Sequence, residues 1–306
     1  MPAFNGDAPL AIFTYNRPEH TARLLHSLEG NSEFAHCPVT IYCDGPKKPE
    51  HEEAIEKTRQ VIREMAPKRA RLVMRDGNFG LAKSIIGGVS EQVAEHGRVI
   101  VIEDDLVLSP AALGFLNLGL HRYAEAERVM HVSAYMYPVP GLPDRPFFGG
   151  EATCWGWATW DRAWAHFNPD AGALLAEIDR RDARRDFNVR GSHYFYQMLQ
   201  LQRDGKLDSW AIRWYASMFL RGGLSLHPGR SYVENLGFDG SGVHCNVDDR
   251  FIVTTTSRLP QSWPKEIAVS DEAIDALIAY RKKAQHWQSK LTRRVTHALG
   301  RLNPFA

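Results

Sequence analysis

Three consecutive carboxylates, Glu103, Asp104 and Asp105, directly follow the apolar run 99–102. This run reads Val-Ile-Val-Ile, and four β-branched residues in a row are typical of a strand buried on both faces of a parallel sheet. Ligands of such sheets bind outside the carboxyl ends of the strands. Adjacent carboxylates repel one another unless a cation or hydroxyl groups satisfy them, and hard oxygen ligands suit Mg²⁺ or Mn²⁺. The pattern therefore predicts a site for a divalent cation and a diphosphate.

A purely structural role is also open for the acidic triplet. Ser109-Pro110 would begin a helix well, and the carboxylates would then form a solvated acidic turn before that helix. For an isolated triplet this interpretation would be preferred. The buried strand that precedes the triplet favours the binding site.

Two other strand ends carry polar residues of useful types. Arg17 lies just after the apolar run 9–13, and Asp44 follows the run 39–43. Arg17 offers a planar fork of donors to a phosphate or a base, and Asp44 could accept hydrogen bonds from a pyrimidine ring. Each residue alone is weak support, because an arginine often pairs on the surface and Asp44-Gly-Pro is also a good turn sequence.

Strands and helices alternate along the first part of the chain, as the order of apolar runs and amphipathic segments indicates. This alternation predicts right-handed crossovers and an α/β fold with a doubly wound, mainly parallel sheet over roughly residues 1–135. The strand ends described above would then meet at one crevice. The expected strands are 9–13, 39–43, 71–74 and 98–102, and the expected helices are 17–28, 50–65 and 81–94.

The composition changes after residue 136. Residues 137–150 are rich in proline and glycine, which predicts an irregular connection, and four tryptophans follow between 155 and 164. We expect 136–268 to be a second half of the same domain. Residues 269–306 are expected to form a basic amphipathic C-terminal helix, which could lie on an anionic membrane but is at least as suited to pack on protein. Its apolar stripe would comprise Trp287, Leu291, Val295, Leu299 and Leu302.

The amino-acid composition limits the classes of protein to which this chain can belong. The 306 residues are 44% hydrophobic and 24% charged, which is ordinary for a globular protein, and the formal charge of +1 argues against a general nucleic-acid binder. Four cysteines without Cys-x-x-Cys spacing predict reduced thiols and no zinc site. The N-terminus lacks a signal-like segment and no apolar run approaches about 20 residues. We therefore expect a cytoplasmic protein, with peripheral membrane contact left open.

Taken in order, these residues resemble the GT-A nucleotide-sugar glycosyltransferases, most closely the N-acetylglucosaminyltransferase I group and its bacterial relatives. Residues 14–17 are similar to the first nucleotide loop of that group, and 78–83 to its segment near the diphosphate. The resemblance implies that Asp105 of a Glu-Asp-Asp form of the DxD motif holds Mn²⁺ or Mg²⁺. The residues that it assigns to the nucleotide sugar are Thr14, Asn16, Arg17, Asp44, Asn78, Lys83, Glu103 and Asp104.

The resemblance continues more loosely into the second half. Residues 154–160 look like the Gly-Trp segment under the donor sugar and acceptor, which implies a sugar pocket at Trp155, Gly156 and Trp157, although any one tryptophan could be core. Asp208 lies in a segment similar to the one that supplies the catalytic base. Only one of its two usual acids is present, so the position of the base stays open, and Asp208 also suits a helix start. Residues 231–244 resemble a closing loop, which would bring His244 to the metal or diphosphate.

The resemblance implies an inverting, metal-dependent glycosyltransferase acting on a UDP-sugar, with a UDP-N-acetylhexosamine as the leading expectation and a glycan, glycolipid or protein hydroxyl as acceptor. Two other classes stay open. A sugar nucleotidyltransferase would usually carry a glycine-rich basic loop after the first strand, and residues 14–18 contain no glycine. A carbohydrate-binding protein could keep such a fold without turnover. A dinucleotide dehydrogenase is poorly supported because no Gly-x-Gly-x-x-Gly follows the first strand.

Overall fold

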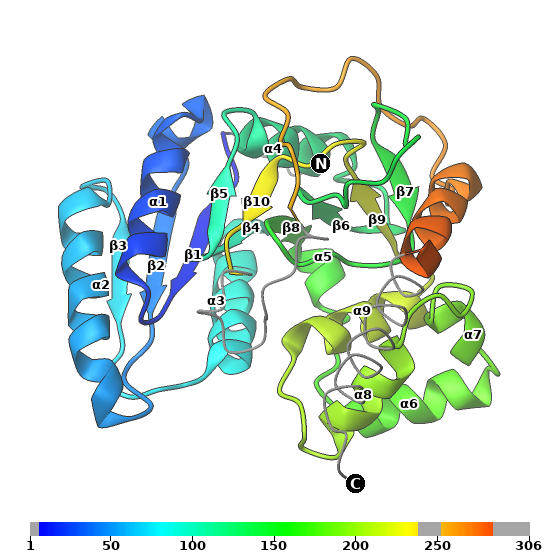
Figure 1. Cartoon of the computed structure of the whole chain (residues 1–306), viewed down its shortest axis with the longest axis horizontal. Coiled ribbons are helices and arrows are strands. Elements are labelled where there is room, and N and C mark those ends of the chain that lie inside the picture. Colours follow the sequence, from blue (N-terminus) through cyan, green and yellow to red (C-terminus); the bar gives the residue numbers. More distant parts are fainter. Residues whose placement is uncertain (1–5, 238–251, 284–306) are drawn as a thin grey trace, which may run out of the picture.

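An eight-stranded sheet with the order β3-β2-β1-β4-β8-β6-β9-β7 forms the centre of the protein in the computed structural model, which describes residues 6–237 and 252–283 (Figure 1). Its first four strands pair in parallel, as the sequence predicts. These strands are β1 (Leu10–Thr14), β2 (Val39–Cys43), β3 (Arg71–Met74) and β4 (Arg98–Glu103).

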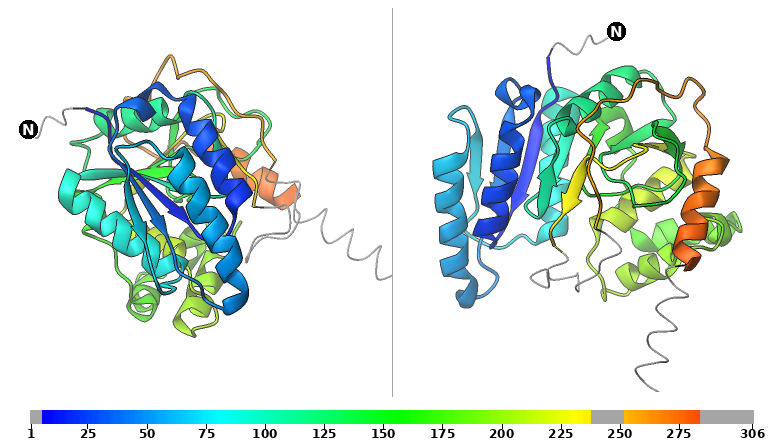
Figure 2. Two further views of the ribbon diagram at one scale, coloured as in Figure 1. Left: turned by 90° about the vertical axis from the view of Figure 1, so that its left-hand side faces the viewer. Right: turned by 45° about the horizontal axis from the view of Figure 1, so that its top comes forward.

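Helices cover both faces of the parallel strands. Figure 2 shows α1 and α2 on one face and α3 on the other, so the expected doubly wound α/β arrangement is confirmed. Proline at the first position of α1 removes an N–H that would have no partner inside the helix, which explains why the helix begins there. The helices are α1 (Pro18–Glu29), α2 (Glu52–Met65) and α3 (Leu81–His96), with short 3₁₀ turns at Ser32–Ala35 and Pro49–His51.

The register of the parallel strands aligns their carboxyl ends. Thr14 lies opposite Cys43, and Phe13 lies opposite Glu103. The segments that follow β1, β2 and β4 therefore emerge side by side at one edge of the sheet. This edge is where the candidate residues of the first half meet.

The second half continues the same sheet with antiparallel pairs and one parallel pair, β6 with β9. Strand β8 lies antiparallel between β4 and β6, and β7 pairs antiparallel with β9. Strand β5 leaves the sheet directly after β4 and pairs with β10. These strands are β5 (Leu106–Leu108), β6 (Val129–Ser133), β7 (Phe147–Gly149), β8 (Trp157–Trp160), β9 (Leu224–His227) and β10 (Val233–Asn235).

The core contains the tryptophans of the second half. Trp157, Trp160 and Trp214 are almost completely buried, and the rings of Trp157 and Trp210 stack with centroids 4.9 Å apart. A separate small core joins α6 to α9. The helices of this half are α4 (Ala112–Arg122), α5 (Asp161–Trp164), α6 (Ala171–Arg180), α7 (Arg184–Phe187), α8 (Phe195–Arg203) and α9 (Trp210–Leu220).

A last described helix, residues 271–283, packs beside β7 (Figure 1). Its buried residues Ala273, Ile274 and Leu277 join Phe147 in a third apolar cluster, so this part of the chain packs on the protein body. The predicted apolar stripe from Trp287 to Leu302 lies outside the described residues. Within the described ranges no helix combines the length and apolar character needed to cross a bilayer.

Candidate active site

The acidic triplet forms the end of β4 and the turn that follows it. Asp104 and Asp105 connect β4 to β5, and α4 begins only at Ala112, so the carboxylates do not cap a helix. The loop after β1 meets this turn. Arg17 Nη1 lies 3.3 Å from Asp105 Oδ2 and 3.8 Å from Asp104 Oδ1. The backbone N–H of Tyr15 donates to Asp104 Oδ2 at 3.1 Å.

The triplet concentrates negative charge in a buried place. Burial and the neighbouring carboxylates raise the pKa of Glu103 well above its usual value and that of Asp104 to about 7, and burial raises the pKa of Asp105. Arg17 opposes these shifts, but one guanidinium cannot neutralise three carboxylates. The cluster therefore favours binding of an additional cation.

The donors present suit a hard divalent cation that also binds a ligand. Asp105 has the more exposed of the two aspartate side chains, 21% against 12% for Asp104. Within residues 6–237 and 252–283, no three histidine, cysteine or carboxylate side chains converge as a complete metal site. Mg²⁺-type sites often take one or two carboxylates and complete their shell with phosphate oxygens and water. His244, the other predicted metal ligand, lies outside the described residues.

Strand β10 brings part of the predicted closing loop, residues 235–237, against the acidic turn, although the sequence does not mark these individual residues for that contact. The N–H of Leu236 donates to the backbone oxygen of Asp105 at 2.8 Å, and the N–H of Gly237 donates to Asn235 Oδ1 at 2.7 Å. A Cβ at Gly237 would lie 2.6 Å from Asp105 Oδ2, so glycine permits the close approach. The sequence signal is Asn-Leu-Gly inside the predicted closing loop.

His20 is a second residue near the triplet that the motifs leave out. It follows Arg17 by three positions on the first turn of α1, which places both on one face of the helix. Its side chain is buried, and its proximity opposes the rise that burial gives to the pKa of Asp105. The spacing from Arg17 is the only signal that would have indicated it.

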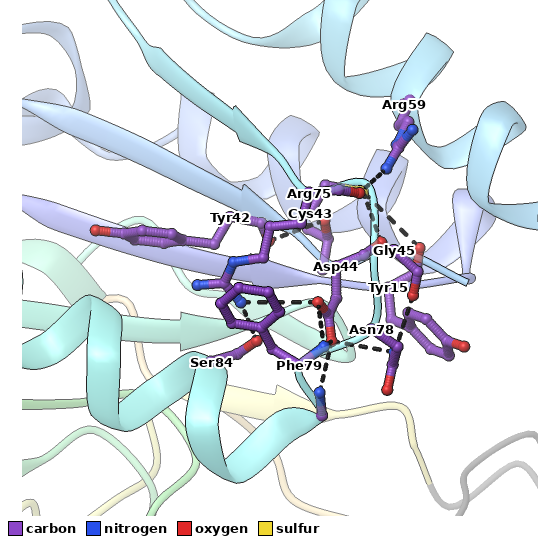
Figure 3. A network of polar contacts seen from close by, with 12 residues as sticks. Tyr15, Tyr42, Cys43, Asp44, Gly45, Arg59, Arg75, Asn78, Phe79 and Ser84 are labelled. Atoms are coloured by element: carbon purple, nitrogen blue, oxygen red, sulfur yellow. Dashed lines mark hydrogen bonds and ion pairs between the residues drawn. The ribbon is translucent and has the colours of Figure 1, made fainter. Parts of the chain in front are cut away.

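Asp44 anchors the loop that leads into α3 (Figure 3). Its carboxylate accepts hydrogen bonds from the N–H groups of Phe79 and Gly80, both at 2.9 Å, and from Asn78 Nδ2 at 3.1 Å. Arg75 Nη1 lies 3.7 Å from Asp44 Oδ1. Asp44 and Asn78 thus come together, and their observed contacts hold the loop. Contact of Asp44 with a nucleobase stays a prediction.

The other predicted nucleotide-binding residues differ in accessibility. Thr14 is buried and its hydroxyl donates to the backbone oxygen of Tyr42 at 3.3 Å, so its side chain supports the sheet. Asn16 and Arg17 are half-buried in the loop after β1, and Lys83 is exposed on the first turn of α3. These three side chains are open to a ligand, whereas Thr14 offers its backbone at most.

A cavity of about 250 Å³ lies beside the predicted sugar segment. Trp155 lines it, with its ring edge-on to Tyr135 and centroids 4.4 Å apart. Gly156 adopts φ of 67°, a conformation that side chains disfavour, at the bend into β8. The expected pocket role of Trp157 needs correction, because its side chain is fully buried in the tryptophan core and cannot contact a sugar.

Asp208 precedes a residue of this cavity in the sequence. That residue, Ser209, lines the cavity and accepts a hydrogen bond from the N–H of Ile212 as the cap of α9. The Asp208 side chain is 70% exposed and lies 3.3 Å from Arg213 Nη2. Asp208 is therefore accessible to a ligand, and Ser209 rather than Asp208 caps the helix.

No family profile and no curated protein sequence matches this chain. Among solved structures, GalNAc-T7 with UDP, GalNAc and Mn²⁺ is 9% identical over 76% of this chain, with a TM-score of 0.47. This chain spans 44% of the length of GalNAc-T7. A mannosyltransferase from Pyrobaculum calidifontis with GDP-Man and Mn²⁺ is 13% identical over 72% of this chain and 71% of its own, with a TM-score of 0.39.

Glucosyl-3-phosphoglycerate synthase from Mycobacterium tuberculosis, in complex with Mn²⁺, UDP and glucosyl-3-phosphoglycerate, is also 13% identical. The similarity covers 66% of this chain and 82% of the synthase, with a TM-score of 0.37. Similarity of this degree assigns the chain to no family. Its function has to be inferred from its own residues.

Proposed function

We propose that this protein is a metal-dependent glycosyltransferase of the GT-A type that uses a nucleotide-diphosphate sugar. The observation that carries the proposal is the meeting of Arg17 with buried Asp104 and half-buried Asp105, beside half-buried Glu103, at the carboxyl edge of a parallel sheet. Excess buried negative charge calls for a cation, and a neighbouring arginine suits a phosphate. A divalent cation bridging a diphosphate satisfies both groups.

The acidic motif and Arg17 would bind different parts of the donor. Asp105, the more exposed aspartate, would hold Mn²⁺ or Mg²⁺, which when bound neutralises the leaving diphosphate. Arg17 lies close enough to contact a phosphate of the same ligand. Asp104 and Glu103 would accept hydrogen bonds from hydroxyl groups of the ribose and donor sugar. His244 would join the metal if its segment closes over the site.

The nucleotide would lie along the loops after β1 and β2. Asp44 fixes the 78–80 loop and would face the base, while Asn16 and Lys83 have side chains open to the phosphates and ribose. Likeness to the N-acetylglucosaminyltransferase I group favours UDP, and UDP-N-acetylhexosamine in particular. This finer assignment rests on the sequence motifs.

Transfer with inversion needs a base for the acceptor hydroxyl and needs both sugars in line. Asp208 is the candidate base because it is accessible and adjoins the cavity wall at Ser209. Trp155 and Gly156 would shape the pocket in which the two sugars meet. The acceptor would be a hydroxyl of a glycan, glycolipid or protein, as in polysaccharide biosynthesis.

The experiment that tests this function measures UDP release from a panel of UDP-sugars with and without acceptor glycans, in Mn²⁺ and in EDTA. Acceptor-stimulated, metal-dependent release that falls by at least about a hundredfold in Asp105→Ala supports the proposal. Asp204→Ala, at an exposed carboxylate directly after α8, is the matched control and should retain full activity. Release that is unchanged in EDTA or in Asp105→Ala would overturn the proposal.

A further inference from the structure

The cavity beside Trp155 reaches a buried ion pair, because Glu151 lines it together with Cys154 and pairs with Arg281. The wall comes from residues before β7, from the segment between β7 and β8, and from α8, α9 and the residues just before these two helices. The lining includes Tyr135, Tyr137, Ala152, Thr153, His193, Phe195, Met198, Ser209, Ala211, Ile212 and Tyr215.

Aromatic rings form much of the wall. Tyr135, Tyr137, Trp155, Phe195 and Tyr215 all line the cavity. Trp155 is only partly buried although its ring packs on that of Tyr135, so part of the indole stays open. Rings of this kind present apolar faces together with a few polar atoms, a combination suited to a ligand that has both C–H faces and hydroxyl groups.

The polar group of the cavity is the carboxylate of Glu151. This residue is 3% exposed, and Arg281 Nη2 lies 2.7 and 2.8 Å from its two oxygens. Arg281 itself is 9% exposed and comes from the helix at 271–283. A carboxylate can accept about four hydrogen bonds. The pair therefore leaves Glu151 able to accept further hydrogen bonds from a ligand.

Charge restricts what the cavity can hold. Burial lowers the pKa of His193 to about 4, so this side chain is neutral near pH 7, and burial raises the pKa of the Cys154 thiol. None of the lining residues therefore carries a positive charge that could bind an anionic ligand. An anionic ligand would approach the Glu151 carboxylate without compensation, and a purely apolar ligand would leave that carboxylate without its remaining hydrogen bonds.

We propose that this cavity binds an uncharged pyranose, with Trp155 and Tyr135 against the sugar ring and the Arg281-held carboxylate of Glu151 accepting hydrogen bonds from its hydroxyls. The inference deepens the proposed function and rests on it for the role of that sugar. The sugar is either part of the donor or part of the acceptor. The cavity selects against sugar acids in both cases.

Saturation-transfer NMR on the full chain tests the proposal with methyl β-glucoside, methyl β-N-acetylglucosaminide and methyl β-glucuronide as probes. We expect transfer to at least one neutral glycoside and at least about tenfold weaker binding of the glucuronide. Equal or stronger binding of the glucuronide, or no transfer to any glycoside, would overturn the proposal.

Two variants assign the signal to the cavity. Glu151→Gln leaves Arg281 without its counter-ion, so binding of the neutral glycoside should weaken and binding of the glucuronide should increase. Ala211→Phe fills the cavity and should abolish transfer to every probe, while Ala173→Phe, at an exposed position on α6, should not change it. Unchanged binding in both cavity variants would contradict the assignment, and retained Mn²⁺-dependent UDP binding verifies that each variant is folded.

A competition experiment distinguishes whether the cavity binds the donor sugar or the acceptor sugar. If the cavity holds the acceptor, the bound glycoside should persist when UDP-N-acetylglucosamine and Mn²⁺ are added. If the cavity holds the donor sugar, that nucleotide sugar should displace the glycoside whereas UDP should not. UDP binding without any glycoside signal would refute the cavity proposal alone, and a glycoside signal without UDP binding would refute the proposed function alone.

Discussion

Two clusters of charged side chains, one on each half of the sheet, differ in how their charges are balanced. At the edge of the parallel half, three carboxylates share one nearby guanidinium, that of Arg17. Beside the cavity, one carboxylate, Glu151, meets one guanidinium, that of Arg281. The pKa of Asp104 is raised to about 7 by burial and its neighbours, whereas Arg281 holds the pKa of Glu151 below its usual value despite burial.

This difference separates a cluster whose charge calls for a ligand from a pair whose charge is balanced without one. The acidic triplet keeps an excess of negative charge that a bound cation would relieve. The Glu151–Arg281 pair is already neutral and ties the helix at 271–283 to the sheet. Substitutions should therefore harm stability at the balanced pair and harm function at the unbalanced cluster.

The largest expected effect is on stability at the balanced pair. Arg281→Met leaves a buried carboxylate without its partner and should lower the free energy of unfolding by about 3–5 kcal/mol. Arg190→Met is the matched control. Arg190 pairs with Asp271 and Asp275 of the same helix but is 43% exposed, so its loss should cost about 1 kcal/mol or less. Urea denaturation measures both, and equal losses would contradict the contrast.

A smaller effect is expected on catalysis at Asp208. Asp208→Asn removes the candidate base and should lower the rate of sugar transfer by at least about tenfold, with little effect on donor binding. The change is measured as kcat for transfer with saturating donor. A loss of less than about tenfold would assign the base to another residue, and Asp204→Asn should leave the rate unchanged.

Acidification should weaken the region around the balanced pair. Burial lowers the pKa of His227, whose Nε2 lies 3.0 Å from the backbone oxygen of Glu151, to about 4. Between pH 6.5 and 4 the unfolded chain therefore binds a proton that folded His227 does not, and stability falls as pH falls. His227→Gln should reduce this slope by up to about 1.4 kcal/mol per pH unit. The free energy of unfolding is measured by denaturant titration at several pH values for the wild type and His227→Gln. Identical slopes of this free energy against pH for the two proteins would refute the assignment.

The smallest effect has the opposite sign. Asp105→Asn removes one charge from the crowded triplet, so the protein without metal should gain stability, on the order of 1 kcal/mol, while losing activity. The test compares melting temperatures in EDTA at pH 7.5. A clear loss of stability there would mean that Arg17 already balances the triplet in the absence of a cation.

Much of the parallel half could be predicted from the sequence because its signals are local. The apolar runs gave the strands, and the register of parallel pairing then required Arg17 and the acidic triplet to meet. The contacts of Asp44 were not predictable, because they depend on where the 78–80 loop folds back. The Glu151–Arg281 pair joins residues 130 positions apart that belong to no motif.

The tryptophans show a further limit of sequence patterns. Trp155 and Trp157 are two positions apart, but β8 begins only at Trp157 and Gly156 has φ of 67°, so strand periodicity does not relate the two side chains. One lines the cavity and the other is core. The resemblance of residues 154–160 to a Gly-Trp segment gave both side chains the same expectation.

The most direct test of the unbalanced cluster is a calorimetric titration of UDP into the wild-type protein and Asp105→Ala, each with and without Mn²⁺. The account predicts that UDP binds the wild type only when Mn²⁺ is present, and that Asp105→Ala loses this binding while remaining folded. UDP binding that does not depend on Mn²⁺, or that is retained in Asp105→Ala, would contradict a metal-bridged diphosphate at the end of β4.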